Sequence, residues 1–184
     1  MKMRSIKFSY SLFLLVMISD LQSNGSVFKT QQQALNETFA DCDTVIRKTL
    51  FLTDDQVQEI QNRAKVKIES KLVNYYFGVK NDSVLAFAFF ETNVVRTKPE
   101  TFMVILAPDA TVKSTEILAF YEPQDYLPTP GWFQLFVGKI LNDALWPKRD
   151  IHGVTGATLT VRAVTQGVRK ILAIYQVAVK EVAN

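Results

Sequence analysis

Two threonines that flank a glycine and an alanine, in the run Thr155-Gly156-Ala157-Thr158, are the residues whose types and spacing could do chemistry. A tight glycine-containing turn here would deliver hydroxyl groups to the first turn of a final helix. Helix N-termini expose unpaired N–H groups and the positive end of the dipole, so they bind phosphate well. Gly156 and Ala157 leave room for a bulky group near the backbone. The alternative is that Thr155, Thr158 or Thr160 only caps the helix.

The segment around this run is rich in residues that fix special backbone geometry. Five of the seven glycines, four of the six prolines and both Trp residues lie between residues 123 and 167. Long irregular segments inside compact domains are usually functional. We therefore expect a Gly/Pro-rich loop with a functional role ahead of a C-terminal helix. That helix would bury one apolar face, made of Val164, Val168, Ile171, Leu172, Tyr175 and Val179.

Two helices are expected near the start of the domain. Thr30 and Gln33 form a capping box ahead of apolar residues at helical spacing, which predicts a helix that continues to Leu50 and has Cys42 as a core thiol. A second box, Thr53 with Gln56, predicts another helix. Its shared apolar face would consist of Val57, Ile60, Ala64, Ile68 and Leu72, and its solvated face of Glu59, Arg63, Lys67 and Lys71.

From residue 72 onward the apolar period changes to two, which is typical of strands. We expect four strands, over residues 73–79, 84–90, 102–106 and 112–121. The unbroken apolar run 84–90 suits a central strand covered on both faces. Polar turns at residues 80–82 and at Pro108-Asp109 would join neighbouring strands. The fold class is therefore predicted as α+β, an antiparallel sheet packed by helices.

Composition excludes several kinds of electron-transfer site. The chain has 184 residues, 48% of them apolar and 21% charged, with one Cys and one His. One Cys forms no intramolecular disulfide, four-Cys zinc site or iron–sulfur cluster, and one His forms no multi-histidine metal site. A net charge of +3 is too small for a nucleic-acid footprint. Redox chemistry in this protein would need an organic cofactor.

The N-terminus has the pattern of a signal peptide. Lys2, Arg4 and Lys7 precede a short apolar stretch over residues 8–18, and the small residues Ser23 and Gly25 follow it. The stretch is shorter than the ~20 residues that span a bilayer. We expect residues 1–25 to be a signal peptide and residues 26–184 to be a single domain. The alternative is an uncleaved membrane anchor.

Residues 151–160 (IHGVTGATLT) resemble the flavinylation motif of the FMN-binding domain family. Residues 117–123 (ILAFYEP) and 133–139 (FQLFVGK) also resemble the family, and residues 37–64 resemble it more weakly. The region is similar to that of the flavin-carrying subunits of the sodium-translocating NADH:quinone oxidoreductase and the Rnf complex. The likeness covers nearly all of the expected domain, and its most specific part lies between residues 117 and 164.

The resemblance implies that FMN is joined to Thr158 through a phosphoester. A threonine hydroxyl is a weak nucleophile, and the family uses a separate flavin transferase, which takes the FMN moiety from FAD with magnesium. The other residues carried over as cofactor-binding are Asp150, His152, Gly153, Thr155, Gly156, Ala157, Leu159 and Thr160. The candidate walls of a flat slot for the isoalloxazine ring are Tyr126, Trp132, Phe133, Phe136 and Trp146. Core packing is the alternative for each of these aromatic residues.

Two residues depart from the family pattern. His152 stands where the motif has Asp, and Asp150, two residues earlier, is a candidate substitute. If the motif Asp presents the threonine to the transferase, His152 would leave a non-covalent FMN protein; alternatively His152 contacts the flavin itself. The second departure is Pro128, in a turn where the family has Glu.

The function expected from the resemblance is that of an exported electron carrier, on the periplasmic or extracytoplasmic face of a membrane. The protein would not turn over a substrate alone. Its partners would be the flavin transferase and a redox donor and acceptor, such as a membrane electron-transport complex. Two alternatives remain: a non-covalent FMN-binding module, and a flavin-free extracytoplasmic binding domain of the same fold.

Overall fold

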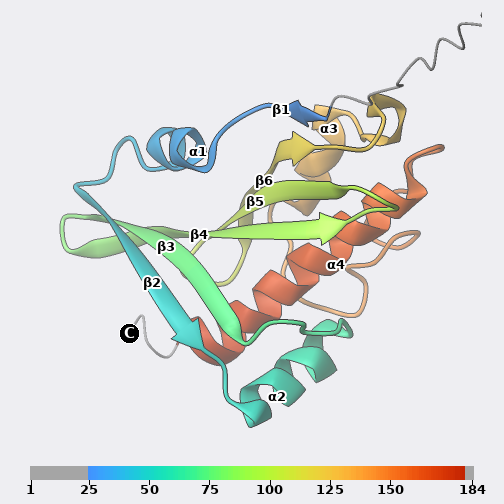
Figure 1. The fold of residues 1–184 in the computed structure, drawn as a ribbon. Coiled ribbons are helices and arrows are strands. Elements are labelled where there is room, and N and C mark those ends of the chain that lie inside the picture. Colours follow the sequence, from blue (N-terminus) through green and yellow to red (C-terminus); the bar gives the residue numbers. More distant parts are fainter. Residues whose placement is uncertain (1–24, 181–184) are drawn as a thin grey trace, which may run out of the picture.

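An antiparallel sheet of six strands, in the order β1-β6-β5-β4-β3-β2, organises the computed structural model, which describes residues 25–180 (Figure 1). The strands are β1 Ser26–Val27, β2 Thr44–Phe51, β3 Leu72–Lys80, β4 Ser83–Val94, β5 Pro99–Leu106 and β6 Val112–Phe120. The helices are α1 Gln31–Thr38, α2 Asp54–Ala64, α3 Pro130–Phe133 and α4 Thr158–Ile174; short helical turns are η1 Gln124–Tyr126, η2 Gln134–Phe136 and η3 Tyr175–Val179. The predicted α+β class is confirmed.

Helices cover the two faces of the sheet unequally. Helices α2 and α4 lie on one face, and α1 lies on the other (Figure 1). Alternate residues of β4 enter the two cores: Phe87 and Phe89 point to the α4 side, and Ala86 and Ala88 to the α1 side. The expected coverage of this strand on both faces is confirmed.

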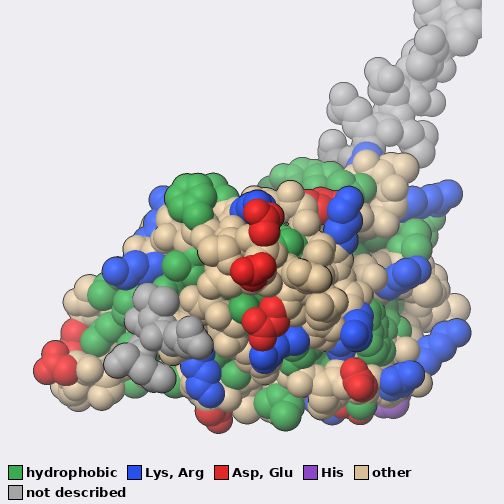
Figure 2. All heavy atoms as spheres, turned by 90° about the horizontal axis from the view of Figure 1, so that it is seen from below, with side chains coloured by type: hydrophobic (Ala, Val, Ile, Leu, Met, Phe, Trp, Pro, Cys, Tyr) green, Lys and Arg blue, Asp and Glu red, His purple; other side chains and the backbone are tan. Residues whose placement is uncertain are grey.

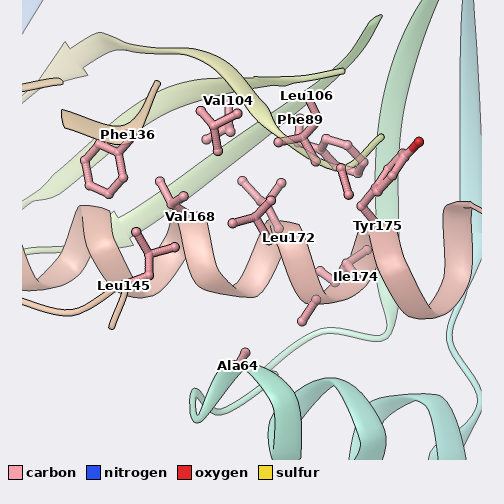
Figure 3. Packing of buried hydrophobic residues seen from close by; sticks show 14 of the residues in the cluster. Ala64, Phe89, Val104, Leu106, Phe136, Leu145, Val168, Leu172, Ile174 and Tyr175 are labelled. Atoms are coloured by element: carbon pink, nitrogen blue, oxygen red, sulfur yellow. The ribbon is translucent and has the colours of Figure 1, made fainter. Parts of the chain in front are cut away.

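The larger core lies between α4 and the sheet. Val168, Leu172 and Tyr175, from α4 and the turn that continues it, pack toward Phe89 and the inner residues of β5 (Figure 3). The apolar face predicted for the last helix is buried throughout. The Tyr175 hydroxyl donates to the Pro108 carbonyl at 2.8 Å, which joins the end of this face to the β5–β6 turn. Helix α4 is therefore fixed along its whole length against the sheet.

The helix predicted to continue to Leu50 is wrong beyond Thr38. Helix α1 ends there, and Thr44–Phe51 forms β2, paired with β3 from Thr44↔Val79 to Phe51↔Leu72. Ile46 and Leu50 are four residues apart, a spacing that fits about one helical turn and also two strand repeats. Cys42 is half-buried in the connection between α1 and β2, not on a helix.

The second helix is also shorter than predicted. Its capping box is present, but α2 ends at Ala64 because Lys65 adopts a left-handed conformation with φ of 55°. Ile68 follows the helix and donates its N–H to the Gln61 side chain at 2.9 Å. Leu72 begins β3, so neither residue continues the apolar face of the helix.

The predicted strands and turns are otherwise confirmed. Two residues with positive φ, Asn81 and Asp82, join β3 to β4, as a tight hairpin requires. The turn after β5 has Pro108 at its second position and closes with a bond from the Ala110 N–H to the Ala107 carbonyl at 3.0 Å. β2 and the short β1 extend the four predicted strands to six.

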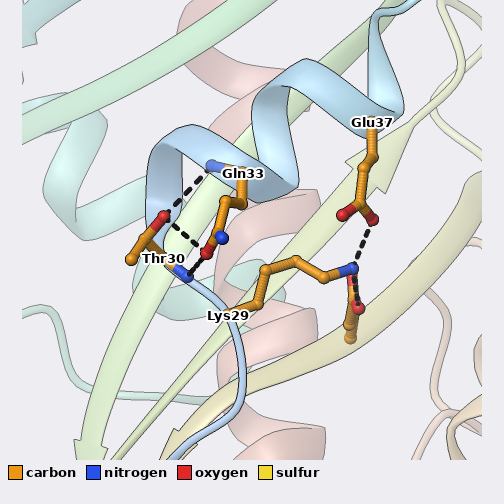
Figure 4. A network of polar contacts seen from close by, with 5 residues as sticks. Lys29, Thr30, Gln33 and Glu37 are labelled. Carbon is orange, nitrogen blue, oxygen red and sulfur yellow. Dashed lines mark hydrogen bonds and ion pairs between the residues drawn. The ribbon is translucent and has the colours of Figure 1, made fainter.

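A polar network joins α1 to the sheet. Thr30 and Gln33 exchange the hydrogen bonds of the predicted capping box (Figure 4). The Lys29 ammonium lies between the carboxylates of Glu37 and Glu116, at 2.6 and 2.5 Å. Because Glu116 belongs to β6, this cation ties the helix to the strand next to β1.

The surface carries no single dominant charge on the face in Figure 2, where acidic and basic side chains are interspersed. Among residues 25–180, no helix is long and apolar enough to cross a bilayer. No group of three or more His, Cys, Asp or Glu residues in the same range could hold a metal ion. The predicted signal segment falls almost wholly outside the described residues.

Candidate functional site

Thr158 is the first residue of α4, and its side chain is exposed. Ala157 occupies the N-cap position, and no side chain caps the helix. The alternative in which Thr155, Thr158 or Thr160 serves as a cap is therefore wrong. Thr160 has another structural role: it is buried, and its hydroxyl donates to the Tyr126 carbonyl at 2.6 Å.

The start of α4 is favourable for an anion. The first turn contains no acidic residue, whereas α2 has a threonine cap together with Asp54 and Asp55 in its first turn. Uncapped N–H groups and the positive end of the helix dipole stabilise a phosphate held there. The side chain of Thr158 lies at this end of the helix and is exposed to solvent.

The turn before the helix depends on one glycine. Gly156 has a φ of +83°, a conformation that L-residues rarely adopt, and the Ala157 N–H closes the turn on the Val154 carbonyl at 3.1 Å. The space beside Gly156 is open, because a methyl group added there would have the Asp125 carbonyl oxygen as its nearest neighbour, at 3.7 Å. Gly153 has an ordinary backbone and open surroundings.

Trp132 anchors the motif loop. Its indole N–H donates to the His152 carbonyl at 2.8 Å, while its ring packs edge-on against Phe133 and Phe136. All three rings are buried in the larger core. Trp132 thus joins the 130–136 segment to the loop that presents Thr158, and core packing accounts for Phe133 and Phe136.

His152 and Asp150 occupy different surroundings. The His152 side chain is exposed. The Asp150 carboxylate accepts from the Lys139 ammonium at 3.1 Å, and the Lys139 carbonyl in turn accepts from the Val112 N–H. Asp150 is therefore engaged with the 133–139 segment, at the end of β6 opposite Phe120. The structure does not direct it toward Thr158.

Trp146 lies away from the motif threonine. Its ring stacks on the Arg169 guanidinium at 4.3 Å from the ring centroid. Arg169 comes eleven residues after Thr158 on α4, which corresponds to roughly 16 Å along the helix axis. The structure therefore places Trp132 and Tyr126 near the motif loop. The Trp146 carbonyl accepts from the Ile151 N–H at 3.3 Å, at the start of the motif, but the Trp146 ring packs on Arg169.

Arg169 is a structural residue that the sequence pattern did not single out. Its fully buried guanidinium donates to carbonyls of Ala64 and Asn142 at 2.8 and 2.6 Å. Burial lowers its pKa from the ordinary value, because desolvation disfavours the charged form. The sequence did contain one indication of this role: Arg169 lies between Val168 and Ile171, two positions of the predicted apolar face.

Two carboxyl groups, Glu91 and Glu100, lie on the strands that α4 covers. Glu91 pairs with Lys170 of the helix. Glu100 is fully buried, and neither of its oxygens has a hydrogen-bond partner. Burial, with Glu91 adding repulsion, raises the pKa of Glu100 to about 8, so this carboxyl is mainly protonated at neutral pH.

Glu122, in the Glu-Pro pair of the 117–123 segment, organises the turn between β4 and β5. Its carboxylate accepts from the backbone N–H groups of Arg96, Thr97 and Lys98, at 3.2, 2.6 and 2.8 Å. These bonds favour the charged form and lower the pKa of Glu122. The sequence resemblance marked this residue, but the structure explains its position as that of a loop anchor.

Comparison with known proteins gives a match to one family model and a similar solved structure. Residues 97–173 match the model of the FMN-binding domain. No curated protein matches the chain. The crystal structure of Shewanella oneidensis NqrC is similar, with 15% sequence identity and a TM-score of 0.49 over 82% of this chain and 85% of that one. The domain match confirms the resemblance to the FMN-binding domain family and indicates FMN as the cofactor. The individual cofactor-binding residues stay predictions.

Proposed function

We propose that the FMN-binding domain matched by residues 97–173 makes this protein an electron carrier, with FMN attached through a phosphoester to Thr158. The observation that carries the proposal is the position of Thr158, which is exposed at the uncapped N-terminus of α4. When bound, FMN supplies one- and two-electron chemistry. The protein supplies binding and orientation.

The residues present fit the phosphate end of the cofactor. The α4 N-terminus offers unpaired N–H groups and no competing carboxylate in its first turn. Gly156 gives the turn its positive φ and leaves the approach open. The Trp132 indole N–H ties the start of the motif loop to the core through the His152 carbonyl, and the Thr158 side chain at the end of this loop is exposed.

Surface exposure of Thr158 also suits attachment by another protein. Within residues 25–180, no histidine or carboxylate forms a hydrogen bond with this hydroxyl, so no neighbouring base is seen to activate it. A separate flavin transferase that takes the FMN moiety from FAD would supply that activation. The exposed side chain of Leu159, next in sequence, offers an apolar surface beside the attachment point.

Co-expression with a flavin transferase tests the proposal. We expect the purified chain to show flavin fluorescence on a denaturing gel. The Thr158→Ala variant should lose this signal, and the matched Thr155→Ala variant should keep it. A colourless wild-type product would reject flavin attachment and favour the flavin-free binding domain, whereas loss of signal only in Thr155→Ala would move the site.

A non-covalent FMN module is the second candidate, and the environment of Asp150 favours it. Asp150 is paired with Lys139, and this ion pair competes with any role of Asp150 as a substitute for the motif Asp at position 152. If that carboxylate presents the threonine to the transferase, His152 weakens covalent attachment. Flavin that is released on denaturation in wild type but retained in His152→Asp would establish this candidate.

Export and a membrane partner complete the proposal. The basic and apolar pattern of residues 1–25 supports export to the periplasmic or extracytoplasmic side. A membrane electron-transport complex would then be the donor or acceptor. Cell fractionation checks this part: the chain should leave the cytoplasm, and deletion of residues 2–20 should retain it there.

A further inference from the structure

Thr160 is a fully buried threonine two residues beyond the proposed attachment point. It lies in the first turn of α4, and its hydroxyl donates to the Tyr126 carbonyl at 2.6 Å. Side chains two residues apart on a helix point about 200° apart around its axis. Thr158 therefore faces solvent while Thr160 faces the domain. The Thr160 hydroxyl is directed at another segment of the protein and not at a ligand held outside the helix.

The acceptor of this bond belongs to η1, the short turn that follows β6. The turn is closed by its own backbone, because the Tyr126 N–H donates to the Pro123 carbonyl at 2.9 Å. At its start, the Gln124 side chain donates to the Ser26 hydroxyl of β1 at 3.0 Å. η1 is thus ordered without α4, and its position relative to the helix depends on the contacts between the two.

The same turn lies against the loop that carries Thr158. The Asp125 carbonyl oxygen is the nearest atom to a methyl group built on Gly156, at 3.7 Å. Within residues 25–180, the bond from Thr160 to Tyr126 is the one hydrogen bond that joins α4 to η1. Loss of this bond would let η1 shift against the glycine turn, and the glycine turn leads directly into Thr158.

A second buried threonine on α4 bonds differently. Thr165 is also fully buried, but its hydroxyl donates to the Val161 carbonyl at 2.7 Å, one turn earlier in the same helix. A threonine within a helix commonly bonds the carbonyl four residues before it. Thr160 and Thr165 share residue type, burial and helix, and they differ because only Thr160 bonds to another segment. Thr165 therefore provides a matched control.

We propose that Thr160 is a positioning residue for flavin attachment: its bond to Tyr126 holds η1 against the glycine turn and keeps Thr158 where a flavin transferase can use it. This inference rests on the proposed attachment at Thr158. In that step the Thr158 oxygen bonds to the FMN phosphorus of FAD, the phosphoanhydride bond breaks, and AMP leaves together with the hydroxyl proton. Thr160 takes no part in these bond changes and acts only through the position of the loop.

The first measurement uses the full chain expressed without a transferase. Thr160→Val keeps the size of the side chain and removes its hydroxyl, whereas Thr160→Ser keeps the hydroxyl. We expect Thr160→Val to shift the backbone amide resonances of residues 124–127 and 155–158, and Thr160→Ser to leave them near their wild-type positions. Thr165→Val should move neither set. Urea unfolding shows which variants are folded, and if Thr160→Val is not, Thr160→Ala compared with Thr160→Ser tests the same hydroxyl on a smaller side chain.

The second measurement is the initial rate at which a flavin transferase adds FMN to each folded chain, followed by intact mass. We expect Thr160→Val to lower this rate about fivefold, the scale of one hydrogen bond, and Thr160→Ser and Thr165→Val to stay within about twofold of wild type. The serine variant separates the hydroxyl bond from general packing, because it loses a methyl group and keeps the donor.

The inference is overturned if folded Thr160→Val is modified at the wild-type rate, or if the amides of residues 155–158 do not move in this variant. It is also overturned if Thr165→Val slows attachment as much as Thr160→Val, because any buried change in α4 would then have the same effect. These results leave the proposed function intact. A wild-type chain that takes up no flavin instead rejects the proposed attachment, and the role of Thr160 with it.

Discussion

Two buried carboxyl groups, Glu122 and Glu100, differ sharply in their hydrogen bonding. Glu122 is satisfied by three backbone N–H groups, whereas Glu100 has no partner. The sequence drew attention to Glu122 through its Glu-Pro pair. It gave no basis to predict that Glu122 would be hydrogen-bonded and Glu100 would not. Their surroundings come from the β4–β5 pairing, which no local pattern reveals.

Glu100 should make the stability of the protein fall as pH rises. Its pKa is about 8 in the folded state and about 4.5 when unfolded, so between these values the folded chain holds more protons. Its contribution is fully present below about pH 4.5 and is lost as pH rises through about 8. We expect Glu100→Gln to flatten this dependence, matching wild type at pH 4.5 and exceeding it at pH 8.

Urea unfolding at pH 4.5, 6 and 8 measures this effect. The Gln side chain keeps the size of Glu and carries no proton that titrates. If wild type and Glu100→Gln lose stability in parallel over this range, the carboxyl does not titrate as described, and other groups account for the pH dependence.

At the scale of elements, the regular segments were the most predictable. Both capping boxes, the strands β3 to β6 and the buried face of α4 follow from local spacing. β2 was missed because the spacing of Ile46 and Leu50 fits a helix and a strand equally. This segment forms a strand because it pairs with β3, and local spacing in the sequence does not reveal that pairing.

Substitution of Gly156 tests whether the turn before α4 positions Thr158. Gly156→Ala places an L-residue at φ of +83°, which should cost about 1–2 kcal/mol and shift Thr158. We expect lower stability by urea unfolding and less covalent flavin after co-expression with the transferase. Gly153→Ala, at a position with ordinary φ and open space, is the matched control and should change neither. Equal behaviour of the two variants would show that the turn geometry does not present the threonine.

At the scale of the whole molecule, long-range contacts position the candidate site. Trp132 joins the motif loop to the 130–136 segment, and Arg169 joins α4 to the end of α2 and to the 142–145 loop. The motif and its helix could be predicted from sequence. The slot expected from five aromatic residues could not, because whether a ring lines a cofactor or fills a core depends on tertiary packing.

Removal of Arg169 should weaken the assembly of these segments. Arg169→Met keeps an unbranched apolar stem but leaves the carbonyls of Ala64 and Asn142 without their donor, a loss of about 3 kcal/mol. Urea unfolding gives the loss, and Arg162→Met, at an exposed position on the same helix, is the control with little expected effect. Similar stabilities of the two variants would contradict the structural role of Arg169.

The mass of the intact protein tests the central claim most directly. After co-expression with a flavin transferase, the account predicts that the wild-type chain gains the mass of one FMN less one water, and that fragmentation places this addition on Thr158. The Thr158→Ala variant, expressed in the same way, should keep its unmodified mass. An unmodified wild-type chain, or the addition on another residue, would contradict the account.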